Sequence, residues 1–471
     1  MNCQNMNKTI RYLQKNGLKH TWYAARERIE EKRKTIYAYE QPIPSVLEQQ
    51  REEGHHLPYH FSIIVPAYET QETFLRELID SVRAQSYEKW ELLIADASVS
   101  GRVEAVVASY QEKEKRIRYL KLEENKGISE NTNAGIMAAQ GDYIGLLDHD
   151  DVLTPDALYE MAIAIYAGEQ RGKTPVLLYS DEDKMETGSA KEKDGNAAYR
   201  FFAPNRKNKF NLDLILSNNY ICHFMVTEAS LMKRLKLRKG YDGAQDYDFV
   251  LRVVDGLLSA SPSASVSMQG REEQIVHVPK VLYHWRCHEL STANNTASKA
   301  YAYEAGKTAL EDFYRKRRWK VKVAHALHLG FYRTEYASDI FRIRQDIGII
   351  GGRVLDRHNR IKTGIYDEEG TRLYQGLHKE YSGGSTHTAS LMQDCRAVDI
   401  RCIRVRDELR PVFAQIVGIA YREIGERKLA DVSGISCDEE GYRKLSMELG
   451  AAAAAMGYLV VWDPQITVRQ D

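Results

Sequence analysis

The chain has 471 residues, of which 66 are lysine or arginine and 66 are aspartate or glutamate, so its formal net charge at pH 7 is zero. This length predicts two or three domains, each able to bury a hydrophobic core. The even charge balance argues against a nucleic-acid partner. The six cysteines are too scattered for a metal-binding pair or a disulfide framework, and the longest apolar stretch, 451–462, is too short to cross a bilayer. We therefore expect a cytoplasmic protein.

The N-terminal segment 1–60 differs from the rest of the chain in charge. Between residues 8 and 34, nine basic residues stand against three acidic ones, and apolar residues recur at roughly helical spacing: Ile10, Leu13, Leu18, Trp22, Tyr23 and Ile29, with a break at Gly17. Such a basic amphipathic helix is able to lie on anionic lipid, which predicts peripheral contact with the inner face of the cell membrane through residues 1–45. The alternative is a solvated helix that packs on the following domain. Pro42, Pro44 and the stretch 54–56 predict a linker after it.

Strands and helices alternate from Phe61 onward. Short apolar runs predict strands at 61–66, 90–95, 117–122 and 143–147, and amphipathic stretches predict helices at 74–82, 103–110 and 131–139. Alternation of this kind is typical of a parallel sheet with right-handed crossovers. We therefore predict an α/β domain with a mostly parallel, Rossmann-like sheet and flanking helices.

The predicted strand at 143–147 leads directly into Asp148-His149-Asp150-Asp151. The carboxyl end of a parallel strand lies at the edge of the sheet where α/β proteins bind ligands. Carboxylates this close together repel one another unless a cation lies between them, and hard divalent ions prefer oxygen ligands. The segment therefore predicts a magnesium or manganese site. The alternative is a solvated acidic turn that caps the helix beginning near Pro155.

Other residues at the predicted strand ends favour a nucleotide. The first strand ends in Pro66-Ala67-Tyr68-Glu69, whose backbone and aromatic ring are suited to hold a base. The second ends at Asp96, which is able to accept the imino hydrogen of uracil or thymine. Asn125-Lys126-Gly127 opens a helix that contains Asn131, and a helix start with a lysine favours a phosphate. No Gly-x-Gly-x-x-Gly or Walker loop follows the first strand, which excludes dinucleotide and P-loop sites of the usual kind.

These motifs, together with the segments 179–184, 243–248 and 281–286, strongly resemble in type and order the family 2 glycosyltransferases with the GT-A fold. The resemblance covers about residues 61–325 and is to bacterial enzymes that build O-antigen, rhamnan-type and other cell-surface polysaccharides. It implies that Asp148 and Asp150 form a DXD motif that binds Mn²⁺ or Mg²⁺, with Asp148 also at the donor. It implies further that Asp96 contacts the base and that His284 is a late metal or diphosphate contact.

The same resemblance implies the substrates. The donor is a nucleoside-diphosphate sugar of the UDP or dTDP type, and the acceptor is a glycan or a lipid-linked saccharide. The chain departs from the family at one point: where a paired Asp-Asp-Gly-Ser is frequent, it has Asp96-Ala97-Ser98. The single acid leaves the identity of the nucleotide open.

Sugar transfer also needs a base for the acceptor hydroxyl. Asp246 and Asp248 open a predicted helix but cannot face the same way on it, and the resemblance assigns Asp246 as the base. The alternative is that both acids only stabilise the helix start. No second carboxylate is assigned as a nucleophile, so we expect direct displacement with inversion. Further candidate cleft residues are Asp151, Asp181, Asp183, Asp248, Trp285, Arg286 and His288, and 181–183 is predicted to be a strand end or a solvated turn.

Residues 335–471 differ from the segments before them. The stretch 346–360 predicts a strand and hairpin, and a helix over 442–455 followed by a strand over 457–464 repeats the helix–strand order of 246–282. Because a second DXD motif is missing, we predict a smaller α+β module that is a truncated, non-catalytic copy used for packing, acceptor binding or dimerisation. A lectin-like module is the alternative. The chain thus divides into an extension at 1–60, a catalytic domain at 61–330 and a C-terminal module at 335–471.

Three functions compete on these grounds. The leading prediction is a metal-dependent inverting glycosyltransferase. A nucleotidyltransferase needs a basic loop directly after the first strand, and 67–70 has none. A catalytically inactive glycan-binding or scaffold protein is expected to have lost the DXD acids or the base, whereas Asp148, Asp150 and Asp246 are all present.

Overall fold

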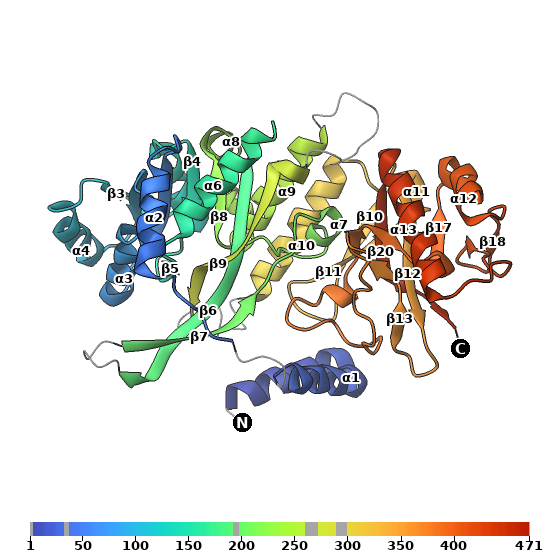
Figure 1. Cartoon of the computed structure of the whole chain (residues 1–471). Helices are drawn as coiled ribbons and strands as arrows, with labels where there is room; N and C mark the ends of the chain where they lie inside the picture. The colour runs from blue at the N-terminus through green and yellow to red at the C-terminus, as the bar shows by residue number, and fades with distance from the viewer. Residues whose placement is uncertain (1–2, 33–36, 192–196, 260–271, 289–298, 471) are drawn as a thin grey trace.

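The computed structural model describes residues 3–32, 37–191, 197–259, 272–288 and 299–470. Figure 1 shows a large sheet flanked by helices, followed by a smaller group of sheets and helices at the C-terminal end of the chain. Helix α1 (Cys3–Lys32) lies below the C-terminal part in this view.

Among the described residues, the large sheet has nine strands, and six of them share one direction. Hydrogen bonds order eight strands as β3-β2-β1-β4-β8-β6-β9-β5, and β7 pairs with β6. Strands β5, β7 and β8 run against the others. The bounds are β1 Phe61–Ala67, β2 Trp90–Asp96, β3 Ile117–Lys121, β4 Tyr143–Leu146, β5 Val152–Leu153, β6 Leu177–Lys191, β7 Ala197–Asn205, β8 Met225–Glu228 and β9 Ile275–Arg286. The predicted α/β fold with a mostly parallel sheet is confirmed.

Helices cover both faces of this sheet because its strands turn apolar side chains to each side in alternation. Ile63 and Val65 share a core with α3, α4 and α6, whereas Ile64 and Ile144 share one with α5, α9 and α10. The helices are α2 Pro44–Gly54, α3 Glu72–Arg83, α4 Arg102–Gln111, α5 Ile128–Ala138, α6 Ala157–Gln170, α7 Leu212–Ile215, α8 Ala229–Leu235, α9 Gln245–Ser259 and α10 Lys299–Lys316. The two cores fix the strands, and with them the edge at which the candidate site residues lie.

The strands and helices predicted between 61 and 147 are confirmed with small differences in their ends. The linker predicted around Pro44 is wrong, because Pro44–Gly54 forms helix α2 and its proline occupies the first turn, where no helical N–H is needed. The strand end or solvated turn predicted at 181–183 is also wrong. Strand β6 continues to Lys191, and Asp181, Glu182 and Asp183 are buried within it.

The C-terminal module follows the hairpin of β10 (Val321–His325) and β11 (Tyr332–Tyr336) and is built on a five-stranded sheet, β13-β12-β20-β15 with β17 beside β12. The predicted strand and hairpin are confirmed as β12 and β13, and the predicted helix and strand as α13 and β20. The bounds are α11 Ile340–Ile343, β12 Ile347–Leu355, β13 Ile361–Thr363, β14 Ile365–Tyr366, β15 Gln393–Cys395, β16 Ala397–Val398, β17 Ile403–Val405, α12 Arg410–Val417, β18 Glu423–Ile424, β19 Leu429–Ala430, α13 Glu439–Ala455 and β20 Leu459–Arg469.

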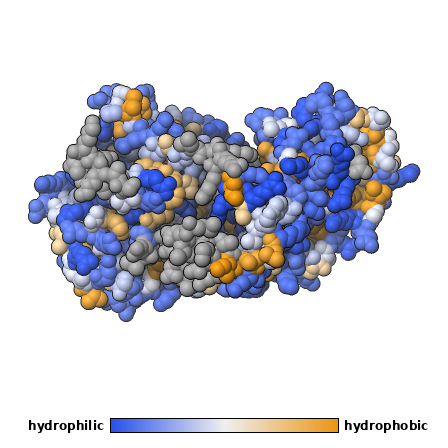
Figure 2. Space-filling view, turned by 90° about the horizontal axis from the view of Figure 1, so that it is seen from below, coloured by the Kyte–Doolittle hydropathy of each residue, from blue (hydrophilic) through white to orange (hydrophobic). Residues whose placement is uncertain are grey.

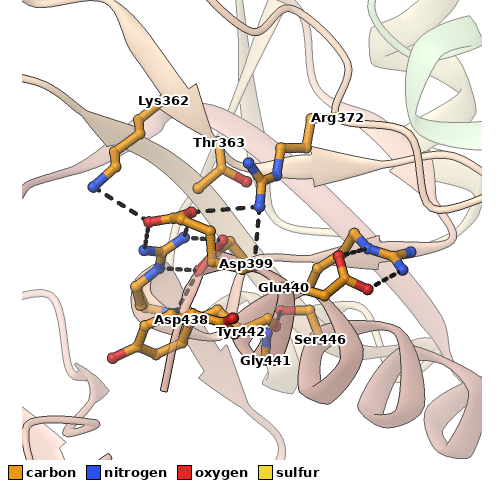
Figure 3. A network of polar contacts seen from close by, with 12 residues as sticks. Lys362, Thr363, Arg372, Asp399, Asp438, Glu440, Gly441, Tyr442 and Ser446 are labelled. Carbon is orange, nitrogen blue, oxygen red and sulfur yellow. Dashed lines mark hydrogen bonds and ion pairs between the residues drawn. The ribbon is translucent and has the colours of Figure 1, made fainter. Parts of the chain in front are cut away.

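A network of ion pairs holds the start of α13 to the sheet of this module (Figure 3). Glu439 accepts hydrogen bonds from Arg401 at 2.7 and 2.9 Å and lies 3.3 Å from the Lys362 ammonium and 3.4 Å from the Arg372 guanidinium. Asp399 binds the remaining side of Arg401 at 2.8 Å. The hydrogen bonds from Arg401, with the nearby cationic charges, lower the pKa of Glu439 to about 2. The carboxylates of this network are therefore neutralised by arginine and lysine.

Arg344 joins the module to the large-sheet domain. Its guanidinium is fully buried, donates to Asp213 of α7 at 2.8 and 3.0 Å, and binds Asp346 at 2.7 Å. Beside it, the carboxylate of Asp394 in β15 accepts the backbone N–H of Leu212 at 2.6 Å. The two parts of the chain are thus connected through a buried interface that includes ion pairs.

Helix α1 is kinked at Gly17, which has φ 78°, and it packs on the C-terminal module and the β10–β11 hairpin. The Glu27 carboxylate accepts the backbone N–H groups of Ser382, Gly383 and Gly384. Lys19 pairs with Glu380 at 2.6 Å. The packing predicted as the alternative to lipid contact is therefore confirmed in part, because the helix does pack on protein, but chiefly on the C-terminal module.

Candidate active site

Buried hydrogen bonds from β9 fix the acidic loop that follows β4. One carboxylate oxygen of the fully buried Asp151 accepts the Tyr283 hydroxyl, and the other accepts the backbone N–H of Arg286 at 2.7 Å. The Arg286 guanidinium donates to the Asp150 carbonyl and pairs with Glu77 at 2.7 Å. Asp151 and Arg286, both predicted as cleft residues, therefore hold the loop in place and leave Asp148 and Asp150 as its candidate ligands.

Asp148 lies in a strongly acidic environment. Its side chain keeps 44% of its surface exposed, and its Oδ2 lies 3.9 Å from Nε2 of His223. Its depth in the protein raises the pKa of Asp148; His223 opposes the shift, and repulsion from Asp150 and Asp246 adds to it. Within the described ranges, no lysine or arginine forms an ion pair with Asp148, Asp150 or Asp246. The fold thus brings together three acids from two distant motifs.

The two candidate histidines of β9 and its end have different carboxylate partners. His288 Nε2 lies 2.8 Å from Asp150 Oδ2, so this histidine is beside the predicted metal ligand. His284 Nδ1 lies 2.5 Å from Asp183 Oδ1 instead, and its ring packs on Phe201 with the centroids 4.4 Å apart. The contacts of His284 therefore join it to Asp183 and not to the DXD acids, contrary to the role implied for it by resemblance.

The two acids at the start of α9, Asp246 and Asp248, have different partners. Asn219 donates to Asp246 Oδ2 at 2.7 Å, and the charge of Asp246 contributes to raising the pKa of Asp148. Asp248 is buried between Arg238 and Arg252, with which it forms ion pairs. Asp246 remains the candidate base, whereas Asp248 is a structural ion-pair partner and not a cleft residue.

A buried lysine, Lys207, lies beside His223, and the sequence analysis did not identify it. The Lys207 ammonium is buried and donates to the carbonyls of Ile221 and His223, and it lies 3.3 Å from Glu182. Burial by itself raises the pKa of Glu182, but the charges of Lys207 and His223 and a hydrogen bond from Asn205 outweigh it, so the pKa is lowered. Lys207 belongs to the basic run 206–209, whose charge was visible but whose burial was not.

The candidate base-binding residues meet at the ends of β1 and β2. Ala67 is the register partner of Asp96, and Tyr68 beyond it keeps 48% of its surface exposed. Glu69 accepts the backbone N–H groups of Val99 and Ser100 at 2.9 and 3.0 Å, which ties the two loops together. The structure therefore places Pro66–Glu69 and Asp96 at neighbouring strand ends, as predicted. The Glu69 carboxylate, however, is taken up by hydrogen bonds within the protein.

Asp96 and the Asn125 turn are held by their own hydrogen bonds. The fully buried Asp96 accepts the Tyr119 hydroxyl at 2.7 Å and the Ser98 N–H at 2.8 Å. Asn125 and Asn131 are joined at 2.9 Å, and the Lys126 N–H donates to Asn131 at 3.2 Å. Gly127 has φ 98°, and the space for a Cβ there is filled by Asp242, 2.8 Å away. A residue other than glycine is excluded from this turn, which fixes the start of α5.

The predicted cleft residues Asp181 and Trp285 have different surroundings. Asp181 is buried, lies 2.8 Å from Nε2 of His277 and accepts the Lys207 N–H at 2.8 Å, so it is not a free cleft carboxylate. The centroid of the Trp285 ring lies 6.3 Å from that of His223, and the Lys184 ammonium is 5.2 Å above it. Trp285 therefore stays a candidate cleft residue next to Asp148.

A segment between α1 and α2 also reaches the site. The Tyr37 hydroxyl donates to Asp183 at 2.7 Å, and the Tyr39 ring packs edge-on against His284 with the centroids 4.5 Å apart. Burial and the Asp183 carboxylate raise the pKa of Tyr37, so it is a neutral donor at pH 7. The segment 37–39, which precedes the predicted linker at Pro42, Pro44 and 54–56, thus packs on Asp183 and His284. The sequence offered one sign of this role, two tyrosines at spacing two.

Two carboxylates fit a divalent cation here, although no described group of three His, Cys, Asp or Glu side chains has the arrangement of a metal cage. Asp148 and Asp150 repel each other without a cationic side chain between them. Mg²⁺ and similar ions bind through one or two carboxylates, with phosphate oxygens and water completing the shell. The donor set therefore fits a cation that a phosphate ligand shares, with Asp148 and Asp150 as the protein ligands.

The comparisons with known proteins bear on the family of the large-sheet domain. Residues 62–238 match the sequence profile of Glycosyl transferase family 2. Uncharacterized protein y4gI of Sinorhizobium fredii is 38% identical over 253 residues, which cover 53% of this chain and 25% of that protein. O-antigen biosynthesis protein RfbC of Myxococcus xanthus is 31% identical over 277 residues, which cover 58% of this chain and 19% of RfbC. The chain therefore spans a quarter or less of the length of these relatives.

A solved structure is similar at a lower level. S. aureus TarS 1-349 in complex with UDP-GlcNAc has a TM-score of 0.38 and 18% sequence identity, over 53% of this chain and 65% of that one. A likeness this distant adds nothing to the assignment of individual residues. The profile match carries the conclusion: residues 62–238 form a domain of the Glycosyl transferase family 2 type.

Proposed function

We propose that the protein is a metal-dependent inverting glycosyltransferase that moves a sugar from a nucleoside-diphosphate sugar to a hydroxyl of a growing cell-surface glycan or lipid-linked acceptor. The observation that carries the proposal is the group of Asp148, Asp150 and Asp246 at the carboxyl edge of the sheet, which has no lysine or arginine partner among the described residues. A polysaccharide product is supported by the name of the relative RfbC, an O-antigen biosynthesis protein.

The residues have separate roles in this proposal. Asp148 and Asp150 would hold Mn²⁺ or Mg²⁺, and the bound ion would supply positive charge to the leaving diphosphate. Asp246, oriented by Asn219, takes the proton of the acceptor hydroxyl as that oxygen attacks the anomeric carbon. The new glycosidic bond forms on the face opposite the departing diphosphate, which inverts the configuration. Pro66–Tyr68 and Asp96 hold a uracil- or thymine-type base at the ends of β1 and β2.

A panel of nucleotide sugars tests this function. The full chain is incubated with each UDP- and dTDP-sugar and with Mn²⁺ or Mg²⁺, and release of the nucleoside diphosphate is measured. We expect release from at least one donor, its loss on chelation, and a fall of about a hundredfold or more in Asp148→Asn, because several kcal/mol of charge stabilisation are removed. Asp80→Asn, an exposed acid of α3, is the matched control. Wild-type release in Asp148→Asn excludes the metal assignment, and no release from any donor favours the inactive scaffold.

We also infer that the protein is cytoplasmic and rests on the inner face of the membrane through α1. Within the described ranges, no helix combines the length and hydrophobicity needed to cross a bilayer. Helix α1 instead turns apolar side chains outward while its polar side binds the C-terminal module: Ile10, Leu18, Trp22 and Ile29 are 46–79% exposed. The face on which α1 lies is shown in Figure 2, where hydrophobic residues stand among hydrophilic ones. Exposed Lys15, Arg26 and Arg28 complement anionic headgroups.

Vesicle sedimentation tests the location. The full chain is expected to bind vesicles that contain anionic lipid, more weakly as salt rises, and not neutral vesicles. The variant Leu18→Ser with Trp22→Ser is expected to reduce binding about tenfold or more without loosening the fold, since both side chains point away from the module. Ser433→Ala, in an exposed loop of the opposite module surface, is the control. Equal binding by the double variant, or no binding by the wild type, removes the membrane assignment.

A further inference from the structure

A cavity of about 240 Å³ lies between the large-sheet domain and the C-terminal module. Asn218, Asn219 and Trp285 line one side of it, and Thr386 and Thr388 of the module line the other. It adjoins the candidate base through Asn219, whose side chain lines the cavity and donates to Asp246 at 2.7 Å. A ligand that contacts Asn219 in this cavity therefore lies one side chain away from the Asp246 carboxylate.

The lining has the chemistry of a carbohydrate site. The amide oxygens of Asn218 and Asn219 are buried and have no hydrogen-bond partner within the described part of the chain. The Asn218 residue as a whole is 7% exposed. Buried acceptors in native proteins are usually satisfied, so both oxygens point to a ligand or water that donates hydrogen bonds. Trp285 adds an aromatic ring, which suits the apolar face of a sugar. Glu182, Lys184, Arg206 and Lys207 also line the cavity, and Lys207 is paired with Glu182. Amide, charged and aromatic groups together fit a sugar unit with neighbouring hydroxyls.

The module side of the cavity is a loop that α1 holds in place. Glu27 Oε1 accepts the N–H groups of Ser382, Gly383 and Gly384 at 3.0, 2.7 and 3.0 Å, and its Oε2 accepts the Ser382 hydroxyl at 3.0 Å. The two glycines have φ 87° and 86°, the left-handed conformation that turns successive N–H groups toward one anion. A single carboxylate of the N-terminal helix thus sets the start of the loop 382–388.

The other end of the same loop is fixed by rings. His387 stacks on His328 of the β10–β11 hairpin with the centroids 3.6 Å apart, and its Nδ1 lies 2.7 Å from the Ser382 hydroxyl. Phe331, which also lines the cavity, meets the His387 ring edge-on at 4.8 Å. The loop is therefore held at both ends, and Thr386 between them is fixed against the cavity.

We propose that the loop 382–388, positioned by Glu27, forms the second wall of an acceptor-sugar subsite whose first wall is Asn218, Asn219 and Trp285. The ligand is one neutral hexose or deoxyhexose unit, and the role assigned to it as acceptor rests on the proposed glycosyltransferase function. Glu27 is a positioning residue in this scheme, because it contacts the loop and not the sugar. The N-terminal helix and the C-terminal module thereby both contribute to substrate binding.

The test measures sugar binding and donor hydrolysis separately on the full chain. Saturation-transfer NMR is recorded with methyl glycosides of glucose, galactose, mannose and rhamnose, and nucleotide release is followed without acceptor. We expect at least one glycoside to bind the wild type and to bind Thr386→Trp at least tenfold more weakly, since the indole fills the cavity. In Glu27→Gln, glycoside affinity is expected to fall at least threefold more than donor hydrolysis. Glu30→Gln, which removes a contact with Tyr381 but leaves the loop amides in place, is the control.

Each outcome either supports or overturns the acceptor-sugar subsite. Unchanged glycoside binding in Thr386→Trp, or no glycoside binding by a wild type that hydrolyses a sugar nucleotide normally, overturns the subsite. If a glycoside binds and Thr386→Trp blocks it while no sugar nucleotide is consumed, the subsite stands and the proposed glycosyltransferase function fails. Thermal unfolding of each variant identifies misfolding, and in that case Thr386→Val, which removes the hydroxyl without adding bulk, replaces Thr386→Trp with an expected weakening of a few fold.

Discussion

The large-sheet domain and the C-terminal module differ in how they treat carboxylates. In the module, Arg401 binds both Asp399 and Glu439, and at the junction Arg344 binds Asp213 and Asp346. At the edge of the large sheet, Asp148, Asp150 and Asp246 have no arginine or lysine partner among the described residues, and only histidines lie near the first two. Like charges that lie close together repel one another, so a fold that gathers these acids without an arginine or lysine favours a cation as their ligand. The missing counter-charge, and not acidity as such, distinguishes the candidate site.

The presence or absence of a cationic partner also distinguishes acids that are neighbours in the sequence. Asp248 is two positions from Asp246 but has two arginine partners, so it resembles the acids of the module, which are also paired with arginine. Glu182 lies between the two classes, because it is buried near Asp148 but is paired with Lys207. The substitutions below are expected to give opposite results in the two classes: loss of activity with retained stability for unpaired acids, and loss of stability for paired ones.

The largest effect is expected for Asp246→Asn. The amide keeps the shape and the contact with Asn219 but cannot take the acceptor proton, so transfer is expected to fall by about 10²–10⁴-fold. The free energy of unfolding is expected to stay the same or rise slightly, because repulsion with Asp148 is removed. Steady-state kinetics with the donor found by the panel, and urea denaturation, measure the two quantities.

Asp248→Asn is the matched control for that variant. It leaves the arginines Arg238 and Arg252 without their buried carboxylate, so its main effect is expected on stability. If Asp248→Asn instead reduced transfer as much as Asp246→Asn at unchanged stability, the assignment of the base would be wrong. A collapse of donor affinity in Asp246→Asn would make Asp246 a binding residue.

Arg344→Met is expected to give the largest loss of stability. The substitution keeps the apolar stem but leaves Asp213 and Asp346 buried without their cation, which costs about 3–5 kcal/mol. Urea denaturation followed by circular dichroism measures the change. A loss below about 1 kcal/mol would mean that the interface between the large-sheet domain and the module does not depend on this ion pair. Pairing with arginine would then not distinguish structural acids from the acids of the candidate site.

A smaller, pH-dependent effect is expected where α1 meets the module. Burial lowers the pKa of His328 to about 4 and that of His387 to about 3, against about 6.5 for the unfolded chain. Since the folded values lie below the unfolded one, the stability that the neutral pair contributes is complete above pH 6.5 and is lost as the pH falls toward 4. The loss at pH 6 is on the order of 1–2 kcal/mol for the pair, and it grows as the pH falls further.

Hydrogen exchange of α1 between pH 7 and pH 5, corrected for the intrinsic rate, measures this effect. Glu27, Lys15 and Arg28 of α1 face the pair and contribute charge of both signs, so a double variant is needed to isolate the histidines. His328→Phe with His387→Phe keeps the ring stack and is expected to remove most of the pH dependence. An equally steep dependence in the double variant would assign the effect to other groups.

The smallest effect is expected for Tyr37→Phe. The variant loses one hydrogen bond to Asp183 while the packing of the neighbouring Tyr39 on His284 remains, which corresponds to about 1 kcal/mol. Because Asp183 keeps His284 as a partner, nucleotide release is expected to change by no more than about threefold. Thermal unfolding and the release assay check both statements, and a tenfold loss of release would make the segment at 37–39 a part of the donor site.

Much of the fold followed from the sequence because local patterns decided it. The apolar runs at 61–66, 90–95 and 143–147 became β1, β2 and β4, since a strand buried on both faces needs a continuous apolar run. The convergence of Asp96 and Asp148 at one edge followed from the parallel order. The extension of β6 to Lys191 did not, because its polar residues resemble a turn until β7 and β9 pair with them.

The sequence by itself determined which acids end the strands of the sheet, because the period of the side chains and the position of turns are local properties. The tertiary structure alone decided which acids have a counter-charge, since Arg238, Arg344 and Lys207 are brought to Asp248, Asp213 and Glu182 from other elements. It also decided that Glu27 reaches the loop 382–384, more than 350 positions away. Contacts over such separations depend on the packing of whole elements, and no local pattern encodes them.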